Sequence, residues 1–267
     1  MVQKTPQQIE LAKLQARLTR RFHKACADYG LIADGDHILI GLSGGKDSLA
    51  LVELLGRRAQ IYKPRFRVTA VHVRVKERAY ATDLSYLEQF CQEAKVPLII
   101  RDTEIGEKPA ISLEGRKVTP SLQGRPGEAA NPCFLCAWYR RKALFDVAQQ
   151  IGCNKIALGH HRDDVAQTLL MNLIFQGAFA TIPPILPMDK MPLSLIRPLY
   201  LIDEVDLTRY AELRNYKKPP KLCPFEHVTS REKAKELLQQ IRQLNPEAVD
   251  NIYGAMTNIK TDYLPKL

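Results

Sequence analysis

The stretch GLSGGKDSLA, residues Gly41 to Ala50, links two apolar segments near the start of the chain. A strand-like run, Ile38 to Ile40, precedes it, and a segment with helical spacing follows it to Arg58. Glycines in such a turn let backbone N–H groups approach an anion, and the helix N-terminus adds a positive dipole end. The stretch therefore predicts a phosphate-binding turn at the edge of a sheet.

The polar side chains of this turn suit an anion, although two common phosphate-binding motifs do not fit. Ser43 and Ser48 offer hydroxyl groups, and Lys46 offers a positive charge. A Walker A loop would need Gly at Ile40 and Ser or Thr at Asp47. The dinucleotide fingerprint G-x-G-x-x-G is also absent. A plain tight turn is the remaining structural alternative.

Strand-like and helix-like segments alternate along the rest of the chain. We expect strands at 38–42, 68–75, 98–101 and 155–158, with a last short one near 196–201. The expected helices are 47–58, 84–94, 134–151 and 163–176, with further helices in the C-terminal third. Capping boxes predict two more helix starts, one at Thr5 with Gln8 and one at Thr229 with Glu232. This order predicts an α/β fold with a doubly wound, mostly parallel sheet. We divide the chain into an N-terminal helical segment, an α/β domain and a helical C-terminal region: 1–36, 37–200 and 201–267.

The net charge of +10 favours a polyanionic partner such as nucleic acid. Solvated helix faces would explain the same charge, and composition alone leaves the two open. The basic residues gather in four groups: 17–24, 63–67, 140–142 and 217–221. There is no apolar run of bilayer length and no signal-like N-terminus, so we expect a cytoplasmic protein without membrane attachment.

The six cysteines divide into two groups. Cys26, Cys91 and Cys153 lie in helical or helix-end patterns and are expected to be ordinary packing residues. Cys133 and Cys136 form a C-x-x-C pair at a predicted helix start. Together with the late Cys223, that pair could be redox-active or hold iron–sulfur or zinc. With His227 as fourth ligand, a closed zinc site of three cysteines and one histidine is possible.

The glycine turn resembles the PP-loop of the ATP-pyrophosphatase superfamily, Ser-Gly-Gly-x-Asp-Ser. The resemblance implies a Rossmann-like fold of the PP-loop (HUP) type and cleavage of ATP between its α- and β-phosphates. It implies that Mg²⁺ separates Asp47 from the phosphates. The cofactor-binding residues implied in this way are Ser43, Gly44, Gly45, Lys46, Asp47 and Ser48 in the turn, His72 and Val73 beside adenine, and Gly159 and His160 near the ribose.

Two acidic residues follow the fourth predicted strand, in ALGHHRDD. Asp163 or Asp164 could bind metal or act on the substrate, whereas a helix cap is the structural alternative. We expect one of them to cap the helix and the other to be functional. Asp164 is the candidate catalytic residue, together with Asp47.

A narrower resemblance covers most of the chain from about His37 to Cys223. PCFLCAWYRRKAL, KIALGHHRDDVAQTLLMNLIFQG and the late cysteine are similar to the tRNA 2-thiocytidine synthetase family. The resemblance implies a [4Fe–4S] cluster on Cys133, Cys136 and Cys223 with one iron left open. The family usually has a second cysteine where this chain has Glu226. The resemblance implies that the ligand is the first cysteine of that late pair, which is Cys223 here, so a cluster on three cysteines is still expected.

The resemblance further implies an ATP-dependent tRNA sulfurtransferase that adenylates the C2 oxygen of a cytidine and replaces it with sulfur. Arg140 is the third candidate catalytic residue, and Trp138 or Tyr139 could stack on a base, although such residues more often belong to a core. The expected partners are tRNA, a second copy of the chain, and a sulfur donor, either a cysteine desulfurase or free sulfide. The alternatives are another PP-loop tRNA modifier, acting on uridine, through a persulfide or by lysidine-type ligation, and a non-catalytic nucleotide-binding metalloprotein.

Overall fold

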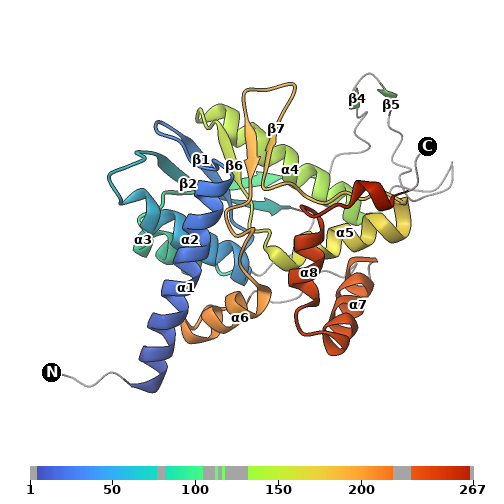
Figure 1. Cartoon of the computed structure of the whole chain (residues 1–267). Coiled ribbons are helices and arrows are strands. Elements are labelled where there is room, and N and C mark those ends of the chain that lie inside the picture. The colour runs from blue at the N-terminus through green and yellow to red at the C-terminus, as the bar shows by residue number, and fades with distance from the viewer. Residues whose placement is uncertain are drawn as a thin grey trace.

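The computed structural model contains a six-stranded sheet flanked by helices (Figure 1). The structure describes residues 5–76, 82–104, 112–113, 116–117, 132–218 and 230–264. The strands of the sheet are β1 (His37–Gly41), β2 (Arg67–Val75), β3 (Leu98–Thr103), β6 (Lys155–Ala157), β7 (Ile185–Pro187) and β8 (Ser194–Ile196). Their order is β3-β2-β1-β6-β8-β7, and every pairing except β7 with β8 is parallel. The predicted α/β class is confirmed.

The helices are α1 (Pro6–Asp28), α2 (Lys46–Ala59), α3 (Leu84–Glu93), α4 (Pro132–Gln150), α5 (Arg162–Gln176), α6 (Glu204–Leu213), α7 (Ser230–Leu244) and α8 (Ala248–Ala255). A 3-10 turn, Thr261–Tyr263, follows them, and β4 (Ser112–Leu113) and β5 (Arg116–Lys117) form a separate ribbon. The predicted helices lie within a few residues of the observed ones. The helix cap predicted at Thr229 lies outside the described residues.

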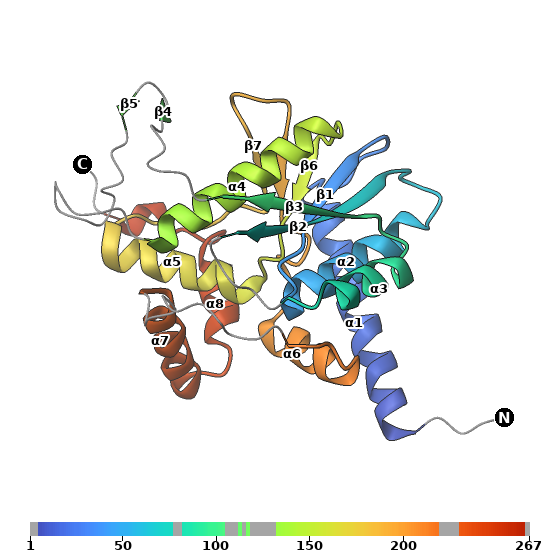
Figure 2. The ribbon, with the colours of Figure 1, turned by 180° about the vertical axis from the view of Figure 1, so that it is seen from behind.

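Helices cover both faces of the sheet, so alternate side chains of β1 pack into two different cores. Ile38 and Ile40 of β1 face the larger core, which the helices α1, α2, α3 and α6 cover. Leu39 points the other way, into a second core beneath α4. Because successive side chains of a strand point to opposite faces, a strand buried on both faces reads as a continuous apolar run. Figure 2 shows α4 on one side of the sheet and α1, α2, α3 and α6 on the other.

The N-terminal helix is part of the main core. Thr5 caps it, with its hydroxyl accepting from the Gln8 N–H at 3.3 Å, as the sequence predicts. Leu18 and Phe22 are buried against the sheet layer. The basic residues Arg17 and Arg21 form ion pairs with the acidic side chains at the start of α6. These two charges, predicted as candidates for a polyanion, are therefore neutralised within the chain.

The edge strand β7 is a feature that the sequence did not predict. It lies in a segment with three prolines, Pro183, Pro184 and Pro187, which argues against a central strand. The edge of a sheet tolerates proline, because one side of the strand needs no ladder hydrogen bond. Pro187 pairs with Ser194 in the antiparallel register of this edge.

The helices α7 and α8 pack on α5. A small buried cluster of Ala166, Leu238 and Val249 joins α5, α7 and α8 (Figure 1). No described helix combines the length and the apolar character needed to cross a membrane. The division at residues 36 and 200 stays a prediction, although α1 and α6 share one core with the sheet.

Candidate functional site

The glycine turn connects β1 to α2 at the carboxyl edge of the sheet. Gly44 has a φ of 86°, a left-handed conformation that side chains other than glycine rarely adopt. Gly45 is the residue that precedes α2, with extended backbone angles. The hydroxyl of Ser48 donates to the Gly45 carbonyl at 2.9 Å and accepts from Ser43 at 3.1 Å. The two serines therefore brace the turn beneath the helix N-terminus.

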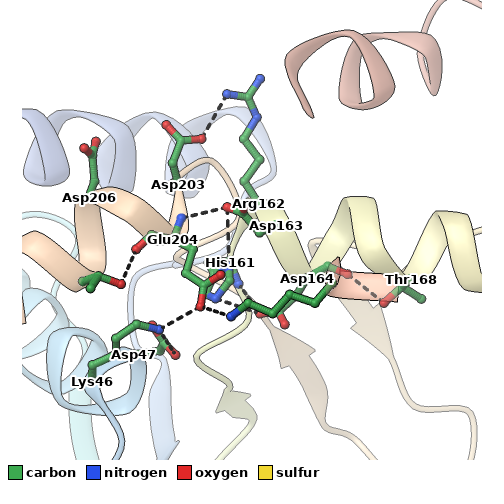
Figure 3. Close-up of polar contacts among 12 residues, drawn as sticks. Lys46, Asp47, His161, Arg162, Asp163, Asp164, Thr168, Asp203, Glu204 and Asp206 are labelled. Atoms are coloured by element: carbon green, nitrogen blue, oxygen red, sulfur yellow. Dashed lines mark hydrogen bonds and ion pairs between the residues drawn. The ribbon is translucent and has the colours of Figure 1, made fainter. Parts of the chain in front are cut away.

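Three helix N-termini meet at this edge, and two of them are closed by carboxylates (Figure 3). Asp164 accepts from the N–H of His161 at 3.0 Å, which caps α5. Asp163 accepts from the N–H of Glu204 at 2.7 Å, which caps α6. At α2 the Gly45 N–H donates to the Ser43 hydroxyl at 3.3 Å, and no described carboxylate accepts from the N–H groups of its first turn. Because free N–H groups and the helix dipole attract anions, the start of α2 suits a phosphate better than the other two helix starts, and its role as the phosphate site stays a prediction.

The acids of ALGHHRDD both have structural partners. Asp164 takes the capping role that was expected of one of the pair. Asp163 is 1% exposed, and it also pairs with Arg242 of α7, so it joins three helices. The residue proposed as catalytic, Asp164, is thus the cap of its own helix, and its catalytic role stays a prediction.

Lys46, the first residue of α2, lies between two carboxylates. Its Nζ is 3.0 Å from Oδ1 of Asp47 and 3.4 Å from Oε1 of Glu204 (Figure 3). Burial favours the neutral amine, but the two carboxylates outweigh it and hold the pKa of Lys46 above its ordinary value. Lys46 is therefore charged at neutral pH. Glu204, far away in the sequence, was not among the predicted site residues.

An apolar cavity of about 190 Å³ lies beside the turn, on the α4 side of the sheet. It is lined by Gly41, Leu42, Ser43, Val71, Val73, Arg140, Leu144 and Leu158. Val73 and Arg140, two of the predicted site residues, thus come together here. His72 points to the opposite face, where it is 2% exposed and its Nδ1 lies 2.8 Å from the Leu42 carbonyl oxygen. Burial lowers the pKa of His72, so its ring is neutral at neutral pH.

Gly159 lies where two backbones approach each other closely. A Cβ atom at Gly159 would be 3.2 Å from the carbonyl carbon of Asp47 and 3.3 Å from the nitrogen of Ser48. Those neighbours are backbone atoms, so they cannot rotate away. The loop after β6 therefore contacts the turn after β1, as the topology of a parallel sheet predicts. His160, the next residue, is half-buried in the same loop.

Of the three cysteines predicted to bind a cluster, only Cys136 has a described side chain. It is buried, one helical turn before Arg140 and two before Leu144 on the same face of α4. Cys136 thus lies along the helix face that leads into the cavity. Cys223 and the side chain of Cys133 lie outside the described residues. Within the described ranges, no three His, Cys, Asp or Glu side chains group as a metal site.

The other cysteines behave as packing residues, as predicted. Cys91 and Cys153 are buried, and Cys26 is half-buried. Burial raises the pKa of the Cys26 and Cys91 thiols to about 12 and that of Cys153 to about 11. These thiols therefore stay protonated at neutral pH and are poor metal ligands.

Trp138 and Tyr139 contact each other edge to face, with ring centroids 4.8 Å apart. Tyr139 also lines a second hollow, between α4 and the end of β3. Neither ring lines the cavity beside the turn. Their predicted stacking on a base has no support from this geometry. Both rings are half-buried and belong to none of the core clusters, so the core alternative is not observed either.

Comparison with known proteins identifies the family. The family model described as a PP-loop domain matches residues 14–217. The tRNA-cytidine(32) 2-sulfurtransferase of Shewanella oneidensis is 36% identical over 94% of this chain and 77% of its own length. This chain is a PP-loop protein of that family. The relative of the same name in Alcanivorax borkumensis is 33% identical over 97% of this chain and 87% of its own. Both predicted resemblances are confirmed.

A solved structure supports the fold of this PP-loop protein. The U34-tRNA thiolase NcsA from Methanococcus maripaludis, solved with its [4Fe-4S] cluster, superposes with a TM-score of 0.69. The match covers 95% of this chain and 82% of the thiolase, at 23% sequence identity. The central sheet and its surrounding helices are therefore shared.

Proposed function

We propose that this PP-loop protein uses ATP to replace the C2 oxygen of a tRNA cytidine with sulfur. The observation that carries the proposal is the N-terminus of α2, which follows a glycine turn, has no described carboxylate as a cap and lies beside an apolar cavity. Membership of the tRNA-cytidine(32) 2-sulfurtransferase family supports the choice of cytidine in tRNA. A tRNA substrate would place the protein in the cytoplasm.

ATP fits the site in one orientation. The apolar cavity beside Val71 and Val73 suits the adenine ring, and the turn suits the phosphates. Gly159 brings its loop against the turn, where the ribose would lie. The Lys46 ammonium group would contact the phosphates. Because Asp47 would repel them, Mg²⁺ is the ion expected between its carboxylate and the polyphosphate.

The first chemical step is adenylation of the base. The C2 oxygen of the cytidine attacks the α-phosphorus of ATP, the bond to the β-phosphate oxygen breaks, and pyrophosphate leaves. Lys46 and the N–H groups of α2 stabilise the negative charge that develops on pyrophosphate. Arg140 faces the same cavity and is suited to hold the RNA or to stabilise charge near the α-phosphate. The oxygen then departs as part of AMP when sulfur takes its place.

The three cysteines would supply the sulfur chemistry. Cys133, Cys136 and Cys223 would hold a [4Fe–4S] cluster, and Cys136 lies along the α4 face that leads to the cavity. When bound, the cluster supplies an iron without a protein ligand, at which sulfide can be held. Zinc on these cysteines and His227 is the alternative occupant. The sulfur itself would come from a cysteine desulfurase or from free sulfide, and a homodimer is the expected assembly.

Nucleoside analysis of tRNA tests the substrate. We expect 2-thiocytidine to be missing from tRNA of cells that lack the gene and to return with the wild-type gene. The Asp47→Ala variant should not restore it. An unchanged thionucleoside profile after gene deletion would remove the assignment.

Metal analysis tests the cluster. Protein purified without oxygen should contain iron and acid-labile sulfide. The Cys136→Ser variant should lose both, whereas Cys153→Ser, a buried thiol outside the site, should keep them. Zinc in place of iron in the wild-type protein would favour the alternative site and refute the cluster.

A further inference from the structure

A second lysine approaches the glycine turn from the C-terminal region. Lys235 of α7 donates to Oε1 of Glu204 at 2.6 Å, and Lys46 of the turn donates to the same oxygen at 3.4 Å. The two ammonium groups are therefore no more than about 6 Å apart, the sum of these two distances. We propose that Lys235 is a phosphate-binding residue of the ATP site and that Glu204 holds it beside Lys46 before the nucleotide arrives. This inference rests on the proposed function.

The helix that carries Lys235 is fixed in place. Leu238, one turn further along α7, is 2% exposed and packs in the cluster with α5 and α8. Arg242, on the same face, pairs with Asp163, the buried carboxylate that caps α6. Spacings of three and seven residues place Lys235, Leu238 and Arg242 on one side of the helix. The packing of Leu238 and the ion pair of Arg242 therefore fix the part of α7 from which Lys235 extends toward the turn.

The charges at this point favour an incoming anion. The side chains of Lys46 and Lys235 are 27% and 44% exposed, so both can contact a ligand from solution. Burial opposes ionisation of Glu204, but both lysines outweigh it and hold its pKa below the ordinary value. Glu204 is therefore ionised and forms ion pairs with both lysines when no phosphate is bound. A polyphosphate chain bound at the turn offers several oxygens to the same pair of lysines.

Calorimetric titration of the protein with Mg²⁺–ATP tests the proposal, because it reports binding without turnover. We expect Lys235→Met to weaken ATP binding by about 10-fold, the lower end of the range for a charged hydrogen bond, because Lys235 is partly exposed. The matched control is Lys233→Met, which removes an exposed charge from the same helix. It should change the Kd less than about 2-fold, because an exposed charge is well screened. Equal losses in both variants would overturn the proposal.

A second variant separates direct contact from an effect through Glu204. Glu204→Gln removes the competing carboxylate and should tighten ATP binding, while Lys235→Met should still weaken it in the Glu204→Gln background. If Lys235→Met has no effect in that background, Lys235 acts only through Glu204 and the proposal fails. Thermal unfolding of each variant confirms that it is folded. A wild-type protein that does not bind ATP would instead contradict the proposed function.

Discussion

The helices α2 and α5 begin in equivalent places yet end up with different roles. Each follows a parallel strand, β1 or β6, and these two strands are neighbours in the sheet. At the start of α5 the His161 N–H donates to the carboxylate of Asp164, whereas at the start of α2 the Gly45 N–H donates to the uncharged hydroxyl of Ser43. The same backbone arrangement therefore carries a negative charge at α5 and none at α2, which is the helix start proposed to bind phosphate.

The two helix starts also differ in how much capping stabilises them. A capping side chain contributes about 1 kcal/mol to the stability of a helix. The carboxylate of Asp164 makes such a contribution at α5, and no described carboxylate makes it at α2. A phosphate site at α2 would therefore give up local stability, while the buried core around α2 holds the helix in place.

The largest effect on ATP binding should come from adding a carboxylate at the residue that precedes α2. Gly45 has backbone angles that suit an aspartate cap, and a Cβ there would meet no atom closer than 3.5 Å. Gly45→Asp should keep the protein folded but place a carboxylate in the phosphate position. Repulsion of several kcal/mol should raise the Kd of ATP more than about 100-fold. The measurement is calorimetric ATP binding with thermal unfolding alongside.

Gly45→Ala is the matched control for that change, because it adds a Cβ without a charge. The Kd of ATP for this variant should stay within about 3-fold of the wild-type value, because alanine brings no charge to the phosphate position. Normal ATP binding by Gly45→Asp would show that the open N-terminus of α2 is not the phosphate site.

A smaller effect, on the rate of pyrophosphate release, is expected at Gly159, where the loop before α5 contacts the start of α2. Gly159→Ala would push the loop before α5 away from the backbone of Asp47 and Ser48. A displacement of this kind should lower the rate of pyrophosphate release by up to about 100-fold. Gly254→Ala, in open space within α8, is the control and should leave that rate unchanged. A rate equal to wild type in Gly159→Ala would show that the close approach does not matter for catalysis.

The smallest effect, on the free energy of unfolding, is expected when the carboxylate of Asp164 at the start of α5 is removed. Asp164→Ala should lower the free energy of unfolding by about 1 kcal/mol, because the His161 N–H loses its acceptor. Asp164→Asn keeps an oxygen for that N–H and should keep most of the stability. Chemical denaturation measures both values. Loss of pyrophosphate release in the asparagine variant, with stability retained, would assign Asp164 a catalytic role beyond capping.

Local patterns predicted the elements of this molecule well. The capping box at Thr5 and the apolar run of β1 depend on residues close together in the sequence, and both formed as predicted. The edge strand β7 was missed, because its pairing with β8 outweighs the proline content of its segment. The order of the strands was not predictable from periodicity, since pairing joins residues far apart in the chain.

The candidate site was predictable only in part. The glycine turn was identified from one short segment, and Val73 and Arg140 were placed near it. His72 was named with them, but its side chain faces the other side of the sheet, as strand alternation requires. Glu204 and Lys235 carry no local signal, because acidic residues are common in the first turn of any helix and lysines are common on helix surfaces.

The sequence by itself therefore determined the α/β class, the turn between β1 and α2 and the packing role of three cysteines, Cys26, Cys91 and Cys153. Those features depend on short-range spacing, which fixes backbone conformation and residue chemistry. Only the tertiary structure decided which helix starts are closed, which strand face meets the cavity and which charges surround Lys46. Each of those depends on contacts between segments that are distant in the chain, and burial makes such contacts specific.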